Sequence, residues 1–398
     1  MKKCLAAGLA LTIATIGGAA DRPAPAPSPA PYAGVYQPQG KDEIGLWRED
    51  DENERAMANS PQVIRDEALT GYVKGVLCSV VGADRCNATR VYVVREPSFN
   101  ATMSPNGTMR VYSGLLLRVR SEAELGSVLG HEFGHFEQRH SLAAHKAWRS
   151  SSNFMAWAAV LASFSTYAAQ TFNSTQLSIY GGFYRFGRNQ EREADLLGLG
   201  YLNASTHRPQ AAARVWRNQI AEVEASAKSR GLSKPRFDRI AFYASHPPTA
   251  ERAGYLAALA RTDADGRDEG KARYAAAMAR WTPVFLNDQI KLNDFGASEY
   301  ILASLAEDGW TAPLLFARGE LFRGRGMQRD LVHAAEFYAK AVEMDPNLAE
   351  AHRGLGLALA KIGRGSESRA AIQSYLRLKP DAPDASVMAM TLTSLGAN

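Results

Sequence analysis

Two histidines four residues apart, with a glutamate directly after the first, constrain this 398-residue chain more than any other feature. They are His131, Glu132 and His135, in the pentapeptide HEFGH. On an α-helix, residues four apart project from one face, so the two imidazoles can hold one metal ion while Glu132 reaches a water molecule on it. Residues 121–124 form a capping box, and apolar residues follow at helical spacing, which predicts a helix here. Taken alone, the pentapeptide could still be a chance match on a solvated helix.

A three-ligand metal site needs one more protein ligand, which a second helix-compatible run downstream can supply. Glu191 in that run offers a carboxylate. Asp195 follows one helical turn later, where it can accept the free ring N–H of a ligating histidine. Arg192 and Glu193 are expected at solvated positions. The sequence therefore predicts one Zn²⁺ ion per chain, held by the two histidines and Glu191, although other divalent ions would fit the same groups.

These motifs resemble those of the zinc metalloproteases typified by the CAAX prenyl protease and HtpX, also called minigluzincins. The resemblance rests on HExxH, ExxAD and the arginine at position 188, and it extends over roughly residues 47–256. Three further stretches are similar to family motifs: Phe99-Asn100-Ala101, Val111-Tyr112-Ser113-Gly114-Leu115, and His246-Pro247-Pro248-Thr249-Ala250-Glu251-Arg252. Several motifs in the family's order are far more specific than HExxH alone. The resemblance implies a mostly helical α+β fold, with a zincin-like domain whose small sheet lies next to the HExxH helix.

The resemblance also implies roles for single residues around the metal. Glu132 would take a proton from the attacking water and deliver it to the leaving amine, while zinc polarises the water and the scissile carbonyl. His246 would stabilise the oxyanion, or bind the zinc as a fourth ligand and hold the enzyme latent, or be an ordinary loop residue. Arg188 and Arg252 would brace the site, the latter by pairing with Asp195 or the loop backbone.

The strand near Asn100 and Ala101 is expected to bind substrate, because an exposed strand edge can pair with an extended peptide. Pairing of this kind reads the backbone more than the side chains, which predicts broad specificity for unfolded or misassembled chains. The remaining histidines show no ligand spacing and are expected at the surface: His140, His145, His207, His333 and His352.

The first 20 residues have the pattern of a secretory signal peptide, with two lysines, a short apolar run and small residues up to Ala20. Residues 21–44 are rich in proline and alanine, which predicts a stiff, solvated linker. Export would leave Cys78 and Cys86, which are expected to form a disulfide; two free buried thiols are the alternative. Cleavage removes two lysines and lowers the formal net charge from +5 to about +3, which argues against a nucleic-acid surface.

No transmembrane span is expected after signal cleavage, because a spanning helix needs about 20 predominantly apolar residues. The longest internal apolar stretch, residues 154–169, is diluted by polar residues. It lies between the two ligand motifs, so it is either a lid over the cleft or a plain core helix. We expect the protease domain at residues 45–260 and a helical connector at residues 261–309.

Residues 310–385 carry an internal repeat. Ala334, Tyr338, Ala341 and Pro346 follow the packing pattern of a tetratricopeptide unit, and Pro380 lies one 34-residue period after Pro346. Such repeats form a concave surface that holds segments of other proteins, although they could instead only cap the protease domain. Residues 386–398 are expected to form a tail.

This organisation is similar to the soluble, periplasmic BepA-like branch of the family. It predicts an exported endopeptidase that hydrolyses misfolded or misassembled cell-envelope proteins, with the repeats recruiting substrates or outer-membrane assembly machinery. The competing interpretation is a chaperone or assembly factor whose zinc site is structural or latent. An intact Glu132 favours the protease, because a purely structural site has no need of a general base.

Overall fold

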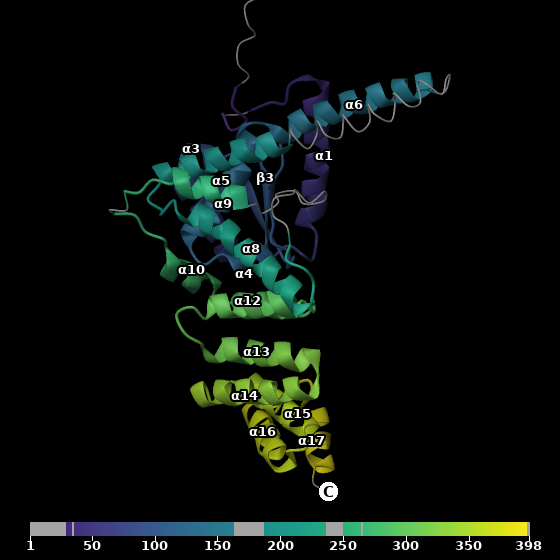
Figure 1. Cartoon of the computed structure of the whole chain (residues 1–398), viewed down its shortest axis with the longest axis vertical. Coiled ribbons are helices and arrows are strands. Elements are labelled where there is room, and N and C mark those ends of the chain that lie inside the picture. Colours follow the sequence, from purple (N-terminus) through teal and green to yellow (C-terminus); the bar gives the residue numbers. More distant parts are fainter. Residues whose placement is uncertain (1–28, 34–35, 163–186, 236–249, 264–265, 396–398) are drawn as a thin grey trace, which may run out of the picture.

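The computed structural model describes residues 29–33, 36–162, 187–235, 250–263 and 266–395. Their elements form two connected parts: a domain around a small sheet, and a tapering stack of helices that ends at the C-terminus (Figure 1). The mostly helical α+β fold expected from the sequence is confirmed. The predicted signal peptide, His246 and residues 163–169 of the apolar stretch lie outside the described residues.

The sheet has three strands within the described residues, in the order β1-β3-β2. They are β1 (Arg90–Val94), β2 (Ala101–Met103) and β3 (Thr108–Tyr112). β1 runs parallel to β3, whereas β2 pairs antiparallel to β3. The alternation of buried and partly exposed residues in β3 is that of a strand with one face on the core. Because β2 is the last strand in this order, it forms one edge of the sheet.

The central helix of the domain is α5 (Glu122–Glu137), which carries the HEFGH pentapeptide. Its N-cap residue Ser121 accepts a hydrogen bond from the backbone N–H of Glu124, as the capping pattern predicts. The Glu124 carboxylate, however, accepts the N–H of Arg120 rather than that of Ser121. Fourteen residues of α5 are buried, so the helix runs through the core with polar groups enclosed.

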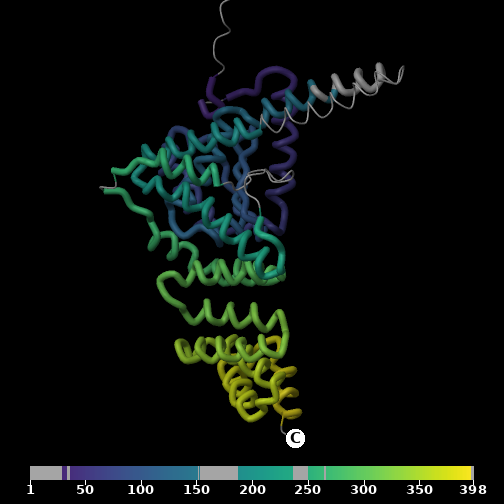
Figure 2. Tube along the Cα trace, in the orientation of Figure 1, coloured from purple at the N-terminus to yellow at the C-terminus, as the bar shows by residue number. Residues whose placement is uncertain are grey.

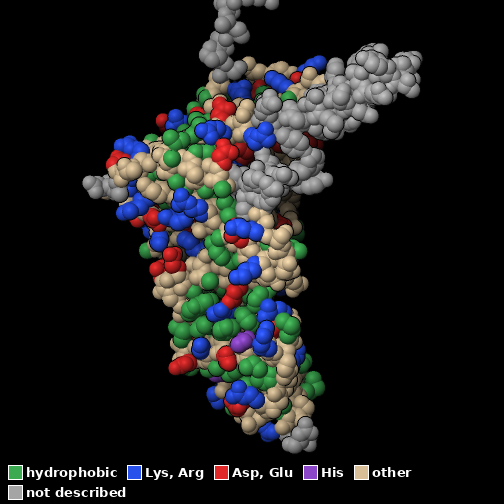
Figure 3. All heavy atoms as spheres, viewed as in Figure 1, with side chains coloured by type: hydrophobic (Ala, Val, Ile, Leu, Met, Phe, Trp, Pro, Cys, Tyr) green, Lys and Arg blue, Asp and Glu red, His purple; other side chains and the backbone are tan. Residues whose placement is uncertain are grey.

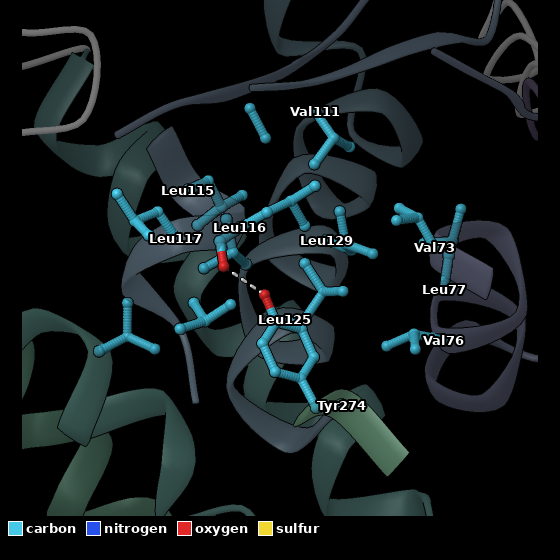
Figure 4. Packing of buried hydrophobic residues seen from close by; sticks show 14 of the residues in the cluster. Val73, Val76, Leu77, Val111, Leu115, Leu116, Leu117, Leu125, Leu129 and Tyr274 are labelled. Carbon is cyan, nitrogen blue, oxygen red and sulfur yellow. Dashed lines mark hydrogen bonds between the residues drawn. The ribbon is translucent and has the colours of Figure 1, made fainter. Parts of the chain in front are cut away.

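Four elements pack around α5 to make the core shown in Figure 4: α2 (Glu67–Val81), α4 (Ser113–Arg118), β3 and α10 (Lys271–Met278). The hydroxyl of Tyr274 on α10 donates a hydrogen bond of 2.5 Å to the carbonyl of Leu116 on α4. The labelled apolar side chains are Val73, Val76, Leu77, Val111, Leu115, Leu116, Leu117, Leu125 and Leu129. Burial of so many aliphatic side chains around one helix fixes its position before any metal binds.

A second helix, residues 187–204, lies against α5 at very close range. A Cβ placed on Gly198 would lie 2.8 Å from the backbone nitrogen of His131. Gly130 and Gly134 of α5 face the same helix, at Gly198 and Ala194 respectively. Because real Cβ atoms essentially never come so close to backbone, only glycine fits at position 198.

The N-terminal residues depart from the expected linker at two places. Helix α1 begins inside it and spans Gly40–Ala58. Tyr32 packs its ring against Phe133 of α5 and donates a hydrogen bond of 2.6 Å to Glu137. The linker prediction was therefore wrong for this stretch, because an aromatic residue within the proline-rich segment can bury its ring against the domain. Residues 59–66 are not helical and separate α1 from α2.

The rest of the protease region is helical. α3 (Ala83–Cys86) follows α2, and the two are joined by a disulfide between Cys78 and Cys86, as the cysteine count predicts. α6 (His140–Ala162) leaves the end of α5 and extends away from the body (Figure 1). α8 (Ala211–Ser229) and α9 (Ala250–Leu259) pack on each other. Within the described residues, no helix is both long enough and apolar enough to cross a membrane.

The C-terminal helices follow one another in a stack, as the tube in Figure 2 shows. The connector holds α11 (Thr282–Ile290) and α12 (Phe295–Leu305) after α10, and the stack continues with α13 (Ala312–Arg325), α14 (Gln328–Met344), α15 (Ala349–Lys361) and α16 (Gly365–Leu378). Tyr338 of α14 is fully buried, with its ring between Gly319 and Gly354. Its hydroxyl donates to Glu320.

The expected C-terminal tail is instead largely helical. Helix α17 spans Ala385–Ser394. Its Met388 is buried in a small apolar cluster that includes Ile372 and Tyr375 of α16. The tail prediction was wrong because a short segment with little charge can still form a helix when a neighbouring helix buries one of its faces.

Candidate metal centre

Three of the predicted ligands converge at one point of the domain. The Nε2 atoms of His131 and His135 lie 3.2 Å apart, on one face of α5. The carboxylate of Glu191 approaches both, at 3.6 Å from Nε2 of His131 and 3.3 Å from Nε2 of His135. One donor atom from each residue lies within 4.8 Å of the other two. Two imidazoles and one carboxylate are a donor set suited to zinc and leave a further coordination position open.

The sequence brings these groups together through helix geometry and glycine. His131 and His135 share a face because they are four residues apart on α5. Glu191 sits two helical turns before Gly198, where the two helices are in close backbone contact. The spacing of ligand to glycine therefore sets where the carboxylate lies along the face of α5.

Asp195 lies on the far side of His131 from the other ligands. Its Oδ1 atom is 2.9 Å from Nδ1 of His131, so the carboxylate can fix the tautomer that leaves Nε2 free. Burial alone would raise the pKa of Asp195, but contact with His131 and with the Arg252 guanidinium holds that pKa well below its usual range. Burial also lowers the pKa of His131, more than the nearby carboxylates raise it. A neutral imidazole is the form that binds metal.

Arg252 joins the two carboxylates of the site. It donates to Asp195 from Nε at 2.8 Å and from a terminal nitrogen at 2.7 Å, and its other terminal nitrogen lies 3.0 Å from Glu191. Both Arg252 and Asp195 are buried. The guanidinium stacks 3.9 Å above the ring of Trp216, and Tyr255 donates to Asp195 as well. Arg252 is thus placed as the sequence predicts for a residue that braces the site.

The other side of His135 faces His140, which was expected at the surface. His140 is instead buried, and its Nδ1 lies 2.8 Å from Nδ1 of His135. Burial lowers the pKa of His140, and so does the positive charge that His135 can carry. His207 is the second correction, since it is buried with Nε2 at 2.9 Å from the hydroxyl of Ser79. The spacing argument considers only residues that share one face of a single helix. It could not predict that the turn after α5 places His140 beside His135.

The remaining predicted residues occupy different places. Glu132 is buried on α5, directly after His131. Arg188 is exposed and makes no ion pair with the site in the part of the chain that the structure describes. Arg192 and Glu193 are exposed, as expected. Sequence reasoning missed Trp216 and Tyr255, because neither belongs to a motif that the resemblance supplied.

Of the predicted substrate strand, Ala101 and its neighbours form β2 at the sheet edge. The carbonyl of Asn100 accepts the N–H of Tyr112 at 3.1 Å, and the N–H of Ser104 donates to Thr108 at 2.8 Å. Along a strand, the N–H and C=O groups of successive residues point to alternate sides. Those of Asn100 and Ser104 point toward β3, so those of Ala101 and Met103 point away from it. The backbone carbonyl of Asn100 is therefore already hydrogen-bonded within the sheet.

Comparison with known proteins places this site in a family. Residues 67–260 match the profile described as Peptidase family M48, and all the described site residues fall within that range. The matched range, 194 of the 398 residues and somewhat under half of the chain, is similar to peptidase family M48. The match supports a metalloprotease domain, and the resemblance noted in the sequence is thereby confirmed.

Individual relatives each match less than half of this chain. A putative beta-barrel assembly-enhancing protease of Vibrio cholerae is 31% identical over 157 residues, 37% of this chain and 32% of that protein. The mitochondrial metalloendopeptidase OMA1 of Schizosaccharomyces pombe is 29% identical over 189 residues, 46% of this chain and 50% of that protein. The metalloprotease YcaL of Escherichia coli is 31% identical over 170 residues, 42% of this chain and 59% of that protein. The matches thus span from about a third to somewhat over half of these relatives' lengths.

Proposed function

We propose that this chain is an exported, zinc-dependent endopeptidase that hydrolyses misfolded or misassembled cell-envelope proteins. The observation that carries the proposal is the convergence of His131, His135 and Glu191 beside a buried Glu132. A site that only stabilised the fold would gain nothing from burying a further carboxylate next to its ligands, since burying a charge is costly.

The chemistry follows from the donor set and its neighbours. Zinc bound by the three ligands would supply a Lewis acid that makes water acidic near neutral pH and polarises the scissile carbonyl. Glu132 would accept the proton of the attacking water and pass it to the leaving amine. Asp195 and Arg252 would hold His131 and Glu191 in place, so that no ligand has to reorganise during the reaction.

Substrate would lie along the edge of the sheet as an additional strand. The main chains of Ala101 and Met103 point away from β3, but both residues are buried, so an extended peptide would pair with their N–H and C=O groups only after the groups that cover this edge move aside. Such pairing needs an unfolded segment in the substrate and accepts many sequences. It therefore supports a role in removing misfolded proteins.

The C-terminal helices would recruit substrates or partners. A cavity of about 460 Å³ lies between α14, α15 and α16, lined by the small or apolar residues Ala335, Ala339, Val342, Leu355, Leu359, Ala370 and Ala371 and by polar residues at its rim. Hydrophobic side chains also gather among charged ones over the lower, C-terminal part of the molecule in Figure 3. Helix pairs that repeat along a chain commonly form peptide-binding surfaces of this kind, and we assign these helices as tetratricopeptide repeats.

The envelope role rests on the leader pattern of residues 1–20 and on two relatives whose names describe proteases that enhance beta-barrel assembly. Recovery of the chain from the periplasm with Asp21 as its first residue would support export. A full-length chain in the cytosol would contradict it.

The decisive experiment is degradation of casein by the purified protein, run beside Glu132→Gln, with bound zinc measured in both. The amide has nearly the shape of the carboxylate but cannot accept the proton, so we expect cleavage to fall by at least about 100-fold while zinc is retained. If neither protein cleaves although both hold zinc, the latent or chaperone interpretation is favoured, and His246→Ala becomes the next variant to test. If neither holds zinc, the metal site itself is refuted.

A further inference from the structure

The most informative group outside the recognised motifs is His140, the first residue of α6. Three contacts fix it between the two helices that carry the ligands. Its Nδ1 lies 2.8 Å from Nδ1 of His135, and its Nε2 lies 3.2 Å from Oε2 of Glu193. Its backbone carbonyl accepts a hydrogen bond of 3.2 Å from the side chain of Gln190.

Only one arrangement of protons satisfies these contacts when His135 binds a metal. Nε2 of His135 faces the other ligands, so a neutral ring must carry its proton on Nδ1. That proton points at His140, whose Nδ1 must then be the acceptor. The proton of His140 is left on Nε2, where it can donate to Glu193. The direction of each hydrogen bond is thus set by the metal ligand.

We propose that His140 is a positioning residue that accepts the Nδ1–H of His135 and so holds this ligand in its metal-binding tautomer and orientation. The inference rests on the proposed function of the site. It gives His135 the support that Asp195 gives His131, with an imidazole in place of a carboxylate. Partners of this kind raise the basicity of a ligand and fix its ring, which strengthens metal binding.

The turn before α6 makes this contact possible. Arg139 has a φ of 54°, a left-handed conformation that non-glycine residues adopt only at a cost. The side chain of Arg139 is held by the carbonyl of Pro29 and lies 3.4 Å from a carboxylate oxygen of Glu43. It also stacks 4.7 Å from the ring of Tyr36. The N-terminal segment therefore stabilises the reversal that returns His140 to His135.

The test uses two substitutions that differ only in where they place an acceptor. His140→Asn puts an amide oxygen near the position of Nδ1, whereas His140→Gln puts it one bond further out, near Nε2. His145→Ala is the control, because His145 lies on the same helix and no hydrogen bond, ion pair or ring contact links it to the site residues that the structure describes. Zinc affinity would be measured on each full chain by competition with a chromogenic chelator, and the Co²⁺-substituted proteins compared by their visible spectra.

We expect His140→Ala and His140→Gln to weaken zinc binding by about 10- to 100-fold and to alter the Co²⁺ spectrum. His140→Asn should restore most of that loss, and His145→Ala should match the wild type. Equal zinc affinity in wild type and His140→Gln would overturn the inference, as would equal losses in the Asn and Gln variants. If His140→Ala does not fold, the Asn and Gln pair still decides. Absence of zinc from the wild type would instead refute the proposed function.

Discussion

The glycine contact between α5 and the 187–204 helix should control metal binding from a distance, and Gly198→Ala tests this. The added Cβ would lie 2.8 Å from the backbone nitrogen and 3.0 Å from the Cα of His131, where ordinary contact begins at 3.4 Å. Both atoms are backbone, so no side chain can rotate away. The helices must separate by about 0.6 Å, which is more than the roughly 0.2 Å that metal–ligand distances tolerate.

Gly200→Ala is a matched control on the same helix, since nothing lies within 4 Å of the position of its added Cβ. Replacing a helical glycine by alanine favours the helix by about 1 kcal/mol in both variants, so this effect cancels between them. Overpacking a tight contact costs about 1–3 kcal/mol. The free energy of unfolding of Gly198→Ala should therefore be lower than that of Gly200→Ala by about 1–3 kcal/mol.

Two measurements check this reasoning. Guanidinium denaturation of the chelator-treated proteins gives the difference in unfolding free energy without any contribution from metal. Zinc competition gives the effect on the site, where we expect weaker binding in Gly198→Ala and wild-type binding in Gly200→Ala. Two variants of equal stability that both bind zinc like the wild type would show that the helices do not need their close contact to form the site.

Three further results are expected. The hydrogen bond from Arg90 lowers the pKa of Glu54 to about 2, although burial would raise it. The ionised carboxylate therefore stabilises the fold fully at pH values above its ordinary pKa of 4.5, and this stability is lost as the pH falls toward 2. Between pH 7 and pH 3, the free energy of unfolding should decline less steeply in Glu54→Gln than in the wild type. Replacing Cys78 and Cys86 by serine should lower the free energy of unfolding by about 2.5 kcal/mol, the chain-entropy value for so short a loop, and a loss near zero in urea denaturation would contradict it. Gly354→Ala, whose Cβ would lie 2.6 Å from the ring of Tyr338, should lower the melting temperature of the C-terminal helices, and an unchanged melting curve would show that this ring can move.

The sequence was sufficient to place two of the three candidate metal ligands together, because their spacing is a local property of helices. His131 and His135 need only one helix to share a face. Glu191 required more, since nothing local relates it to α5; the need for a third ligand suggested it, and the family resemblance supported the choice. The structure adds the physical reason, which is the close approach of the two helices at Gly198.

Residues that depend on chain reversals could not be predicted in the same way. His140 reaches His135 only because Arg139 adopts a left-handed conformation, and arginine carries no sequence signal for that geometry. Tyr32 was assigned to a solvated linker because composition describes a segment as a whole and not the one aromatic residue that docks on Phe133. Both errors concern contacts made by single residues across turns, where neither periodicity nor composition carries information.

The two histidine ligands are supported in different ways, and this difference has a consequence for the site. His131 contacts Asp195, a buried carboxylate that accepts hydrogen bonds from Arg252 and Tyr255. His135 contacts His140, which in turn contacts Glu193. The side chain of Glu193 is 53% exposed, so solvent and salt screen its charge. Changes at the surface near α6 should therefore act on the metal mainly through His135, while the contacts of His131 stay constant.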